Sequence, residues 1–445
     1  MKMKQIARLV PIAMFALAGS QASAAGFQLL EQNASGLGNA YAGTAAVAED
    51  ASTIFFNPAG MTQLQAREFS VGLDFVRPSF EFSNEGSQSY PNIAATGSEA
   101  DDAGSWAAIP NAYLSWALTD RLYVGVGMGA PFGLKTEYND DWVGAAQATL
   151  FDIKTININP SLAFKVNDVV SLGIGLNWQR MEAQYERVAT ATPQIGALPA
   201  IVNAQFAALR ASKLVLDADD DSWGWNVGAL FNISPTTKVG VAYRSKIKHE
   251  LEGSLKAEGT ANATLNAAVG GDASADVELP DTFTLSVAQQ LNDRWEMLGD
   301  VSWTGWSSIQ DVDIYSDKAG RVVQTLETKF RDTWRIALGA NYQLNDAWKL
   351  KFGVAYDQTP VQNQSDRLVS LPDANRTWLS VGGQWKLNPQ SRLDMGLAYL
   401  IVDDTKINND QLNADLTSPT SNRGKVTGEY SSSVIILGAQ YSMSF

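Results

Sequence analysis

Polar and apolar residues alternate along most of residues 67–445. In the last segment, Ile435 and Leu437 stand at odd positions, whereas Gln440 and Ser442 stand at even positions. Successive side chains of a strand point to opposite faces of the sheet. The alternation therefore predicts strands that have one apolar face and one polar face.

The polar face of these predicted strands carries charged residues. Arg335, Lys349 and Lys351 alternate with apolar neighbours in two of the segments. A soluble β-sandwich has a dry inner face, so lysines and arginines on the second face argue against that fold. A barrel whose apolar face meets lipid and whose polar face lines a lumen accommodates both faces. The pattern predicts a transmembrane β-barrel.

Turn signals divide the alternating region regularly, because Asn and Asp tolerate the backbone angles of tight hairpins. Short turns are expected at Thr119-Asp120, Asn167-Asp168, Ser234 to Thr237, Asn292-Asp293, Asn345-Asp346 and Asn388 to Ser391. Longer polar loops are expected near residues 79–105, 134–149, 188–221, 253–275, 313–326, 360–375 and 403–425. Six short turns that alternate with seven long loops predict an all-β fold, an antiparallel transmembrane β-barrel of 14 strands with short periplasmic turns.

Residues 25–65 differ from the rest of the chain. They are rich in Gly, Ala, Ser and Asn and show no sustained alternation. Such a segment buries too little apolar surface to offset its own chain entropy, so it must either stay disordered or pack inside something larger, and the strands that follow favour the second. We predict a small N-terminal hatch that plugs a barrel formed by residues 66–445.

Residues 1–24 have the three regions of a secretory signal peptide: basic residues, a short apolar run, and small residues ending at Ala24. No later stretch has about twenty consecutive apolar residues, so the mature chain is expected either to be soluble and exported or to span a membrane as strands. The expected location is the outer membrane of a Gram-negative bacterium.

Composition narrows the chemistry further. The 445 residues include no cysteine and a single histidine, His249, and the formal net charge is −14. A chain without cysteine has no disulfide or thiolate metal site, and an acidic chain is a poor nucleic-acid binder. His249 has no nucleophile motif beside it and is interpreted as a solvated strand-end residue. We expect no enzyme activity, no cofactor and no metal.

One long loop is predicted to contain a helix. In Pro199 to Leu216, apolar residues including Ile201, Phe206 and Leu214 recur at roughly helical spacing. An apolar helix on an outer loop either caps the barrel mouth or forms a landing groove for apolar ligands.

Several motifs resemble, in order and spacing, the FadL family of outer-membrane long-chain fatty-acid transporters. In the plug they are AGFQL from Ala25, SGLGNAYAG from Ser35, AEDAS from Ala48 and NPA from Asn57. In the barrel they are SWGWNVG from Ser222, AYRSKIK from Ala242, LPDTF from Leu279, WTGWS from Trp303, FRDTWRIALG from Phe330 and LPDANRTWLSVG from Leu371. The resemblance covers essentially the whole mature chain.

The resemblance implies passive uptake of long-chain fatty acids or related hydrophobic compounds. Ligand would be captured at extracellular loops, bound by its carboxylate in the barrel, and released sideways through a kinked strand gated by the hatch. The expected partners are these small molecules and the surrounding outer-membrane lipid and lipopolysaccharide, with no nucleic acid and a monomeric protein. An apolar route is also required physically, because exposing an alkyl chain to water costs about 0.8 kcal/mol per CH₂.

The kink is expected at Pro131, Phe132 and Gly133. Proline removes a ladder donor and the flanking glycines permit a bend, so the strand between Leu122 and Leu134 should be interrupted. The alternative is that Pro131 simply ends a strand at the outer rim.

Arg187 is the candidate for carboxylate capture. Its odd position places it on the luminal face of its strand, the forked donors of arginine suit a carboxylate, and the resemblance implies the same role. The alternative is an ion pair with Glu182 or Glu186. The family's second basic residue falls on Leu326 here, which leaves the nearby cations as candidates, and these are Lys329 and Arg331.

The hatch contributes the remaining candidates. Asn57, Pro58 and Ala59 should form a turn that the resemblance links to ligand release, although Asn-Pro is also a common turn without any gating role. Phe27 is expected, by resemblance, to reach into the ligand pocket. Two other functions stay open: a porin-like diffusion channel, and a surface adhesin or phage-receptor barrel.

Overall fold

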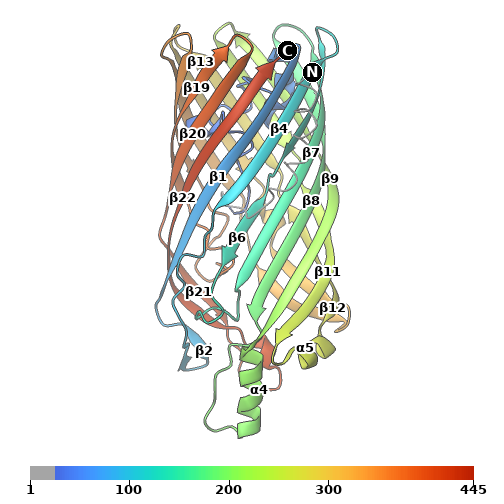
Figure 1. Ribbon diagram of the computed structural model, residues 1–445, viewed down its shortest axis with the longest axis vertical. Helices are drawn as coiled ribbons and strands as arrows, with labels where there is room; N and C mark the ends of the chain where they lie inside the picture. Colours follow the sequence, from blue (N-terminus) through green and yellow to red (C-terminus); the bar gives the residue numbers. More distant parts are fainter. Residues whose placement is uncertain (1–25) are drawn as a thin grey trace, which may run out of the picture.

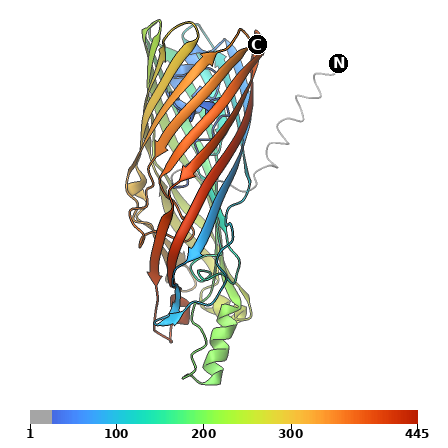
Figure 2. The ribbon, with the colours of Figure 1, turned by 90° about the vertical axis from the view of Figure 1, so that its left-hand side faces the viewer.

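The computed structural model describes residues 26–445. The predicted signal peptide, residues 1–24, lies outside the described residues. The chain forms a tall closed barrel with a small segment inside one end and helices at the other (Figures 1 and 2). No helix among residues 26–445 is long and apolar enough to cross a membrane.

The wall consists of 14 antiparallel strands, several of them interrupted, as the turn pattern predicted. The uninterrupted strands are β1 (Arg67–Asn84), β4 (Ala107–Ala117), β7 (Leu150–Lys165), β8 (Val170–Val188), β9 (Ser212–Ser234), β18 (Trp348–Asp357), β19 (Arg376–Asn388) and β22 (Gly424–Ser444). The interrupted strands are β5 (Leu122–Gly129) with β6 (Gly133–Glu137), β10 (Thr237–Arg244) with β11 (Ile247–Gly259), β13 (Thr282–Gln290) with β12 (Gly271–Leu279), β14 (Trp295–Thr304) with β15 (Asp311–Ser316), β17 (Thr333–Gln343) with β16 (Arg321–Glu327), and β20 (Ser391–Val402) with β21 (Thr405–Gln411). Pairing of β1 with β22 closes the barrel.

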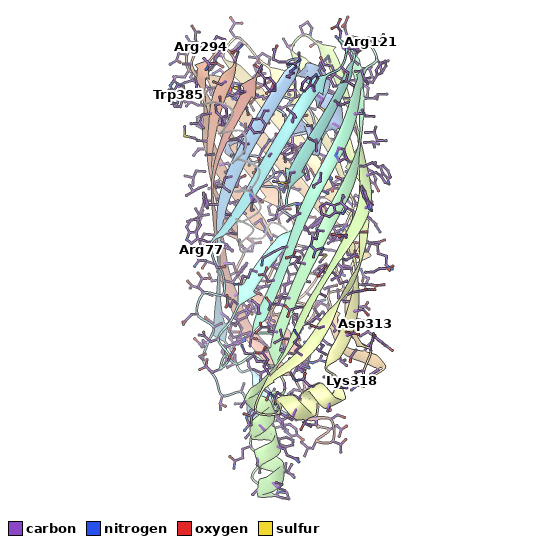
Figure 3. The ribbon with its side chains drawn as sticks, turned by 45° about the vertical axis from the view of Figure 1, so that its right-hand side comes forward. Arg77, Arg121, Arg294, Asp313, Lys318 and Trp385 are labelled. Atoms are coloured by element: carbon purple, nitrogen blue, oxygen red, sulfur yellow. The ribbon has the colours of Figure 1, made fainter. Side chains whose placement is uncertain are left out.

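The short predicted turns are confirmed, since each lies between two consecutive paired strands. They gather at the end of the barrel that also holds the C-terminus (Figure 1). Arg121 and Arg294, from two of these turns, lie at that rim, and Lys318 lies near the opposite end (Figure 3). At the opposite end the chain adds the hairpin β2 (Gln88–Tyr90) and β3 (Ile93–Ala94) and the helices α4 (Ala200–Arg210), α5 (Asn262–Ala268) and η5 (Pro419–Ser421).

Several stretches predicted as long loops are strand instead. β1 continues to Asn84, β9 already begins at Ser212, and β11 continues to Gly259. Beyond the lipid the outer face of a strand meets water and carries polar residues, so the apolar outer face ends although the hydrogen-bond ladder continues. The predicted helix is likewise shorter than expected, because α4 ends at Arg210 and Leu214 belongs to β9.

The two faces of the wall have the predicted polarity. On β17, Ile336 and Leu338 are exposed on the outer surface, whereas Arg335 and Asn341 are buried on the inner side. The apolar outer face suits lipid and the polar inner face suits a filled lumen.

Residues 26–64 lie inside the barrel at the short-turn end (Figure 2). This plug segment contains the short helices η2 (Leu37–Asn39), α3 (Thr53–Phe56) and η3 (Pro58–Gln63). Its polar groups bond to the wall: the Asn39 amide donates to Asn341 Oδ1 (3.0 Å), and Lys351 Nζ donates to the Ser35 carbonyl (2.9 Å). A Cβ at Gly353 would lie 2.0 Å from the Asn39 carbonyl carbon, so glycine lets the wall approach the plug closely.

Candidate functional site

The wall is interrupted between β5 and β6, at Ala130 to Phe132. β5 pairs with β4 on one side and β7 on the other, whereas β6 pairs with β7 alone among the described strands. The predicted interruption is therefore present. Pro131 does not end the strand at the rim, because β6 continues it on the far side of the break.

The first described residues of the plug occupy the inner side of this break. Gln28 forms an antiparallel bridge with Phe132. The Leu29 N–H donates to the Pro131 carbonyl (2.8 Å), and the Gly133 N–H donates to the Phe27 carbonyl (2.8 Å). The plug thus supplies hydrogen-bond partners that a neighbouring wall strand supplies elsewhere.

Phe27 lies in an aromatic cluster behind the break. Its ring centroid is 5.0 Å from that of Trp306 and 5.9 Å from that of Phe132, and Trp306 also contacts Phe330. Phe27 is buried in this cluster and does not line the cavity that contains Arg187. The short helix η4 (Trp306–Ser308) places the Trp306 ring there.

The Asn57-Pro58-Ala59 turn joins the plug to the wall. The Asn57 carboxamide oxygen accepts the Ala59 N–H (3.1 Å) and so caps η3. Its amide group donates to the carbonyl of Ala45 in the plug (2.7 Å) and to that of Ala229 in β9 (3.0 Å). All the polar atoms of this side chain are used in holding the turn against the barrel.

An outer cavity of about 640 Å³ lies under α4 and α5. Its walls combine apolar side chains, such as Phe206 of α4, Leu265 of α5 and Leu216 of β9, with polar ones. No aspartate or glutamate of residues 26–445 lines it, although the chain is acidic overall. The volume suits the chain and headgroup of a small amphiphile.

Arg187 lies at the inner wall of this outer cavity, on β8, with 3% of its surface exposed. Its Nε donates to Gln324 Oε1 (2.8 Å), and its Nη1 donates to the carbonyls of Val188 (3.0 Å) and Ala189 (3.2 Å). No described carboxylate lies within ion-pair distance of Arg187. The guanidinium charge has hydrogen bonds but no counter-ion.

The alternative partners of Arg187 are engaged elsewhere. Glu182 contacts Arg180 (3.2 Å) and Glu186 contacts Lys213 (3.5 Å), on the outward face of the barrel. This outward face of β8 is charged from Arg180 onward, so Arg187 lies beyond the lipid-facing band. Burial lowers the pKa of the Arg187 guanidinium, and the positive charge of Arg423 lowers that pKa further.

The structure does not bring Lys329 or Arg331 to Arg187. The Lys329 ammonium is 51% exposed and pairs with Glu327 (2.7 Å), and Arg331 is exposed with its guanidinium on the Thr359 carbonyl (3.4 Å). Two other cations are near: Arg321 of β16 lines the same cavity, and Arg423, at the end of the loop before β22, acts on the charge of Arg187. No local motif marks Arg423, because only the closure of the barrel brings it beside Arg187.

The interpretation of His249 as a solvated residue is wrong. Its side chain is fully buried on the inner face of β11, with Nδ1 2.9 Å from Asp220 Oδ2 and Nε2 3.3 Å from Gln179 Nε2. Lys246 and Lys248 point outward, so the alternation of the strand turns His249 inward. Among residues 26–445, no group of three or more His, Cys, Asp or Glu residues is arranged to hold a metal ion.

The family model described as outer membrane protein transport protein (OMPP1/FadL/TodX) matches residues 15–445. The chain belongs to this family. A long-chain fatty acid transport protein of Escherichia coli K12 is 30% identical over 417 residues, which cover 88% of this chain and 91% of the relative. As a FadL-family member, the protein is a transporter of hydrophobic small molecules in the outer membrane.

Two solved structures resemble the FadL-family barrel described here. A Pseudomonas aeruginosa FadL homologue superposes with a TM-score of 0.83 at 26% identity and covers 95% of this chain and all of its own. A toluene transporter of Ralstonia pickettii has a TM-score of 0.65 at 17% identity, with 94% of this chain and 100% of its own covered. The second likeness shows a shared fold.

Proposed function

We propose that the protein takes up long-chain fatty acids or similar anionic amphiphiles across the outer membrane. The observation that carries this proposal is an outer cavity with apolar side chains that contains Arg187 and no carboxylate among its described lining residues. The Escherichia coli relative, which is named as a long-chain fatty acid transport protein, supports the same substrate class.

The chemistry of the outer cavity matches such a ligand. A buried charge without a counter-ion is costly, and a bound carboxylate offsets that cost with charge-assisted hydrogen bonds. The acyl chain then covers Phe206, Leu216 and Leu265, at about 0.8 kcal/mol for each buried CH₂. Headgroup and tail are recognised by different parts of one cavity.

Exit is proposed at the break between β5 and β6. The wall lacks a ladder between β4 and β6 there, and the Phe27–Leu29 stretch of the plug holds the inner side. Movement of that stretch would open a sideways path to lipid, with Pro131, Phe132 and Gly133 at its edge. Asn57, Pro58 and Ala59 would hold the rest of the plug in place while its beginning moves.

Oleate uptake by cells that lack their own transporter tests the proposal. We expect Arg187→Gln to lower uptake about tenfold, because an ion-paired hydrogen bond to the carboxylate is lost. Lys329→Gln, which removes an exposed cation of a nearby loop, is the matched control and should leave uptake unchanged. Equal uptake by the wild type and Arg187→Gln at equal surface levels would refute carboxylate capture.

The same cells distinguish the rival functions. A neutral-hydrocarbon transporter would take up toluene as fast as oleate and would ignore Arg187→Gln. A diffusion channel would give steady ion conductance in planar bilayers, which the plug and its wall contacts oppose. An adhesin or phage receptor would keep its binding activity after Arg187→Gln without taking up either compound.

A further inference from the structure

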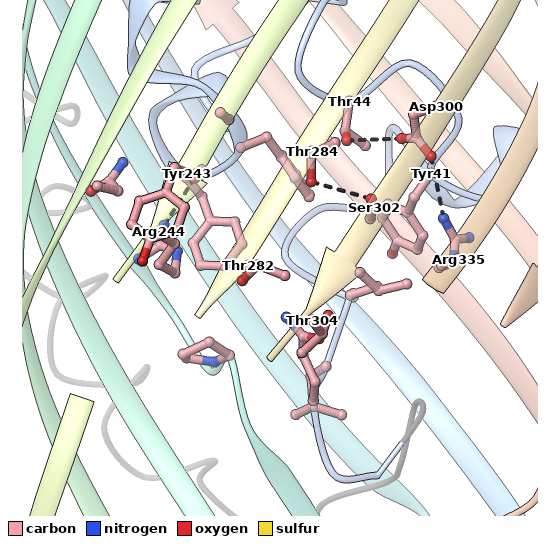
Figure 4. Close-up of a pocket in the computed structure, with 18 of the residues that line it drawn as sticks. Tyr41, Thr44, Tyr243, Arg244, Thr282, Thr284, Asp300, Ser302, Thr304 and Arg335 are labelled. Atoms are coloured by element: carbon pink, nitrogen blue, oxygen red, sulfur yellow. Dashed lines mark hydrogen bonds and ion pairs between the residues drawn. The ribbon is translucent and has the colours of Figure 1, made fainter. Parts of the chain in front are cut away.

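A second, inner cavity of about 80 Å³ lies directly behind the break in the wall. Its lining includes Pro131 and Phe132 from the break, and Tyr41 and Phe55 from the plug. The remaining lining comes mainly from inward residues of β10, β13, β14 and β17 (Figure 4). This inner cavity is large enough for a carboxylate and a few methylenes rather than for a whole acyl chain.

Hydroxyl groups cross the floor of the inner cavity. They belong to Thr282 and Thr284 of β13 and to Ser302 and Thr304 of β14, and the Thr284 and Ser302 hydroxyls are 3.2 Å apart. In Figure 4 they lie between Arg244 on one side and Arg335 on the other. A polar strip with a guanidinium at each end is unexpected on the route of a purely hydrocarbon ligand.

The two guanidiniums are in different electrostatic surroundings. Arg335 faces Asp300 at 3.7 Å, and Asp300 in turn accepts the Thr44 hydroxyl (3.3 Å). Arg244 donates to the Asn177 side-chain oxygen and to the Phe55 carbonyl (2.9 Å), and it stacks on the Phe55 ring at 4.0 Å. Among the described residues no Asp or Glu pairs with Arg244, so this cation faces the inner cavity without a counter-ion.

The outer and inner cavities are joined by apolar packing. Leu216 and Leu265, which line the outer cavity, belong to the same buried cluster as Phe132, which lines the inner one. Phe27 and Trp306 belong to the same cluster. The side chains that join the two cavities are therefore apolar, and passage of an acyl chain requires them to move aside.

We propose that Arg244 is a second carboxylate-binding residue, which holds the headgroup of the ligand in the inner cavity while its acyl chain leaves through the break at Pro131. This inference rests on the proposed uptake of anionic amphiphiles and deepens it. Because neither arginine has a counter-ion, the carboxylate could bind first to Arg187 and then to Arg244, and a guanidinium would balance its charge at both sites. A neutral hydrocarbon gains nothing from either residue.

Uptake of an anionic and a neutral compound of equal length tests the role of Arg244. We expect Arg244→Gln to lower oleate uptake about tenfold while oleyl alcohol uptake changes by less than about twofold, because only the anion uses the guanidinium. Equilibrium binding of oleate to the purified variant should stay unchanged, since Arg187 still holds it. Arg244→Lys, which keeps the charge, should restore most of the oleate uptake.

Arg180→Gln is the matched control, because Arg180 is an outward arginine of the same barrel with carboxylate partners. Equal losses of oleate and oleyl alcohol uptake in Arg244→Gln would show that Arg244 only attaches the plug through Phe55, and would overturn the inference. Unchanged oleate uptake in Arg244→Gln, with a loss in Arg187→Gln, would overturn this inference alone. Absence of oleate uptake by the wild type would overturn the proposed function and this inference together.

Discussion

Two interruptions of the barrel wall have opposite consequences. Between β10 and β11 a residue of the wall fills the gap in the hydrogen-bond ladder. The Ser245 backbone N–H donates to the Trp225 carbonyl (2.9 Å), and the Ser245 hydroxyl accepts the Trp225 backbone N–H (2.9 Å). β11 then pairs with wall strands on both sides. Between β5 and β6 only the side toward β7 is repaired: the Phe132 backbone N–H donates to the Thr155 hydroxyl (2.9 Å), and the Thr155 backbone N–H donates to the Phe132 carbonyl (3.2 Å). Among the described strands β6 pairs with β7 alone.

The comparison shows what turns a break into a candidate opening. The bonds of Pro131 and Gly133 that no wall strand supplies are made by Leu29 and Phe27, which belong to a segment inside the barrel and not to the wall. A break that is satisfied by wall residues can open only if the barrel deforms. A break whose hydrogen bonds are made by the plug can open when the plug moves, which disrupts far fewer hydrogen bonds of the wall.

The largest effect should come from fixing the plug to the break. Gln28 and Phe132 form an antiparallel bridge, so cysteines at both positions (Gln28→Cys with Phe132→Cys) should form a disulfide. The native chain has no cysteine that could pair with them instead. We expect oxidation to abolish oleate uptake and reduction to restore it, measured in one batch of cells.

A disulfide within the wall is the control for the fixed plug. Leu285→Cys with Val301→Cys joins paired residues of β13 and β14 and should leave uptake unchanged in either redox state. Uptake that persists in the oxidised Gln28–Phe132 variant would show that the exit lies elsewhere.

A smaller effect is expected from restoring a donor at the break. Pro131→Ala supplies the backbone N–H that proline lacks and lets β5 and β6 approach a continuous strand. Oleate uptake should fall about threefold, because a more continuous wall is harder to open. An unchanged rate would mean that the proline is not what keeps the break, and that the plug contacts alone do so.

The regular part of the molecule follows from local rules. Alternation predicts which residues of β17 and β22 face lipid, and Asn or Asp dipeptides predict the short turns, because both signals depend only on neighbours along the chain. The break at Pro131 is predictable for the same reason, since nearby glycines permit the bend there, whereas Pro78 of β1 and Pro110 of β4 lie within continuous strands.

The functional site depends on contacts between distant segments. Arg423 approaches Arg187, and Phe27 reaches Trp306, only after the barrel has closed around the plug. The burial of His249 could not be predicted from Lys246 and Lys248, because lysines of other strands, such as Lys351, face the lumen. The absence of a counter-ion at Arg244 could not be predicted either, since it depends on where every carboxylate of the chain lies.

Removing the contact between plug and intact wall should have a modest effect. Asn57→Ala deletes the bonds to Ala45 and Ala229, worth about 1–2 kcal/mol together. We expect amide hydrogen exchange in η3 to accelerate about tenfold and oleate uptake to fall about twofold, as the plug loses its fixed position. Unchanged exchange would show that the turn is held by packing alone.

The smallest effect is expected at the repaired break. Ser245→Ala removes the hydroxyl that accepts the Trp225 N–H, which costs about 1 kcal/mol at a site that stays paired through its backbone. Oleate uptake should equal that of the wild type, while the unfolding midpoint in urea decreases slightly. If Ser245→Ala impaired uptake as strongly as Pro131→Ala, both interruptions would serve as exits, and pairing with the plug would not be what distinguishes an opening from a bend.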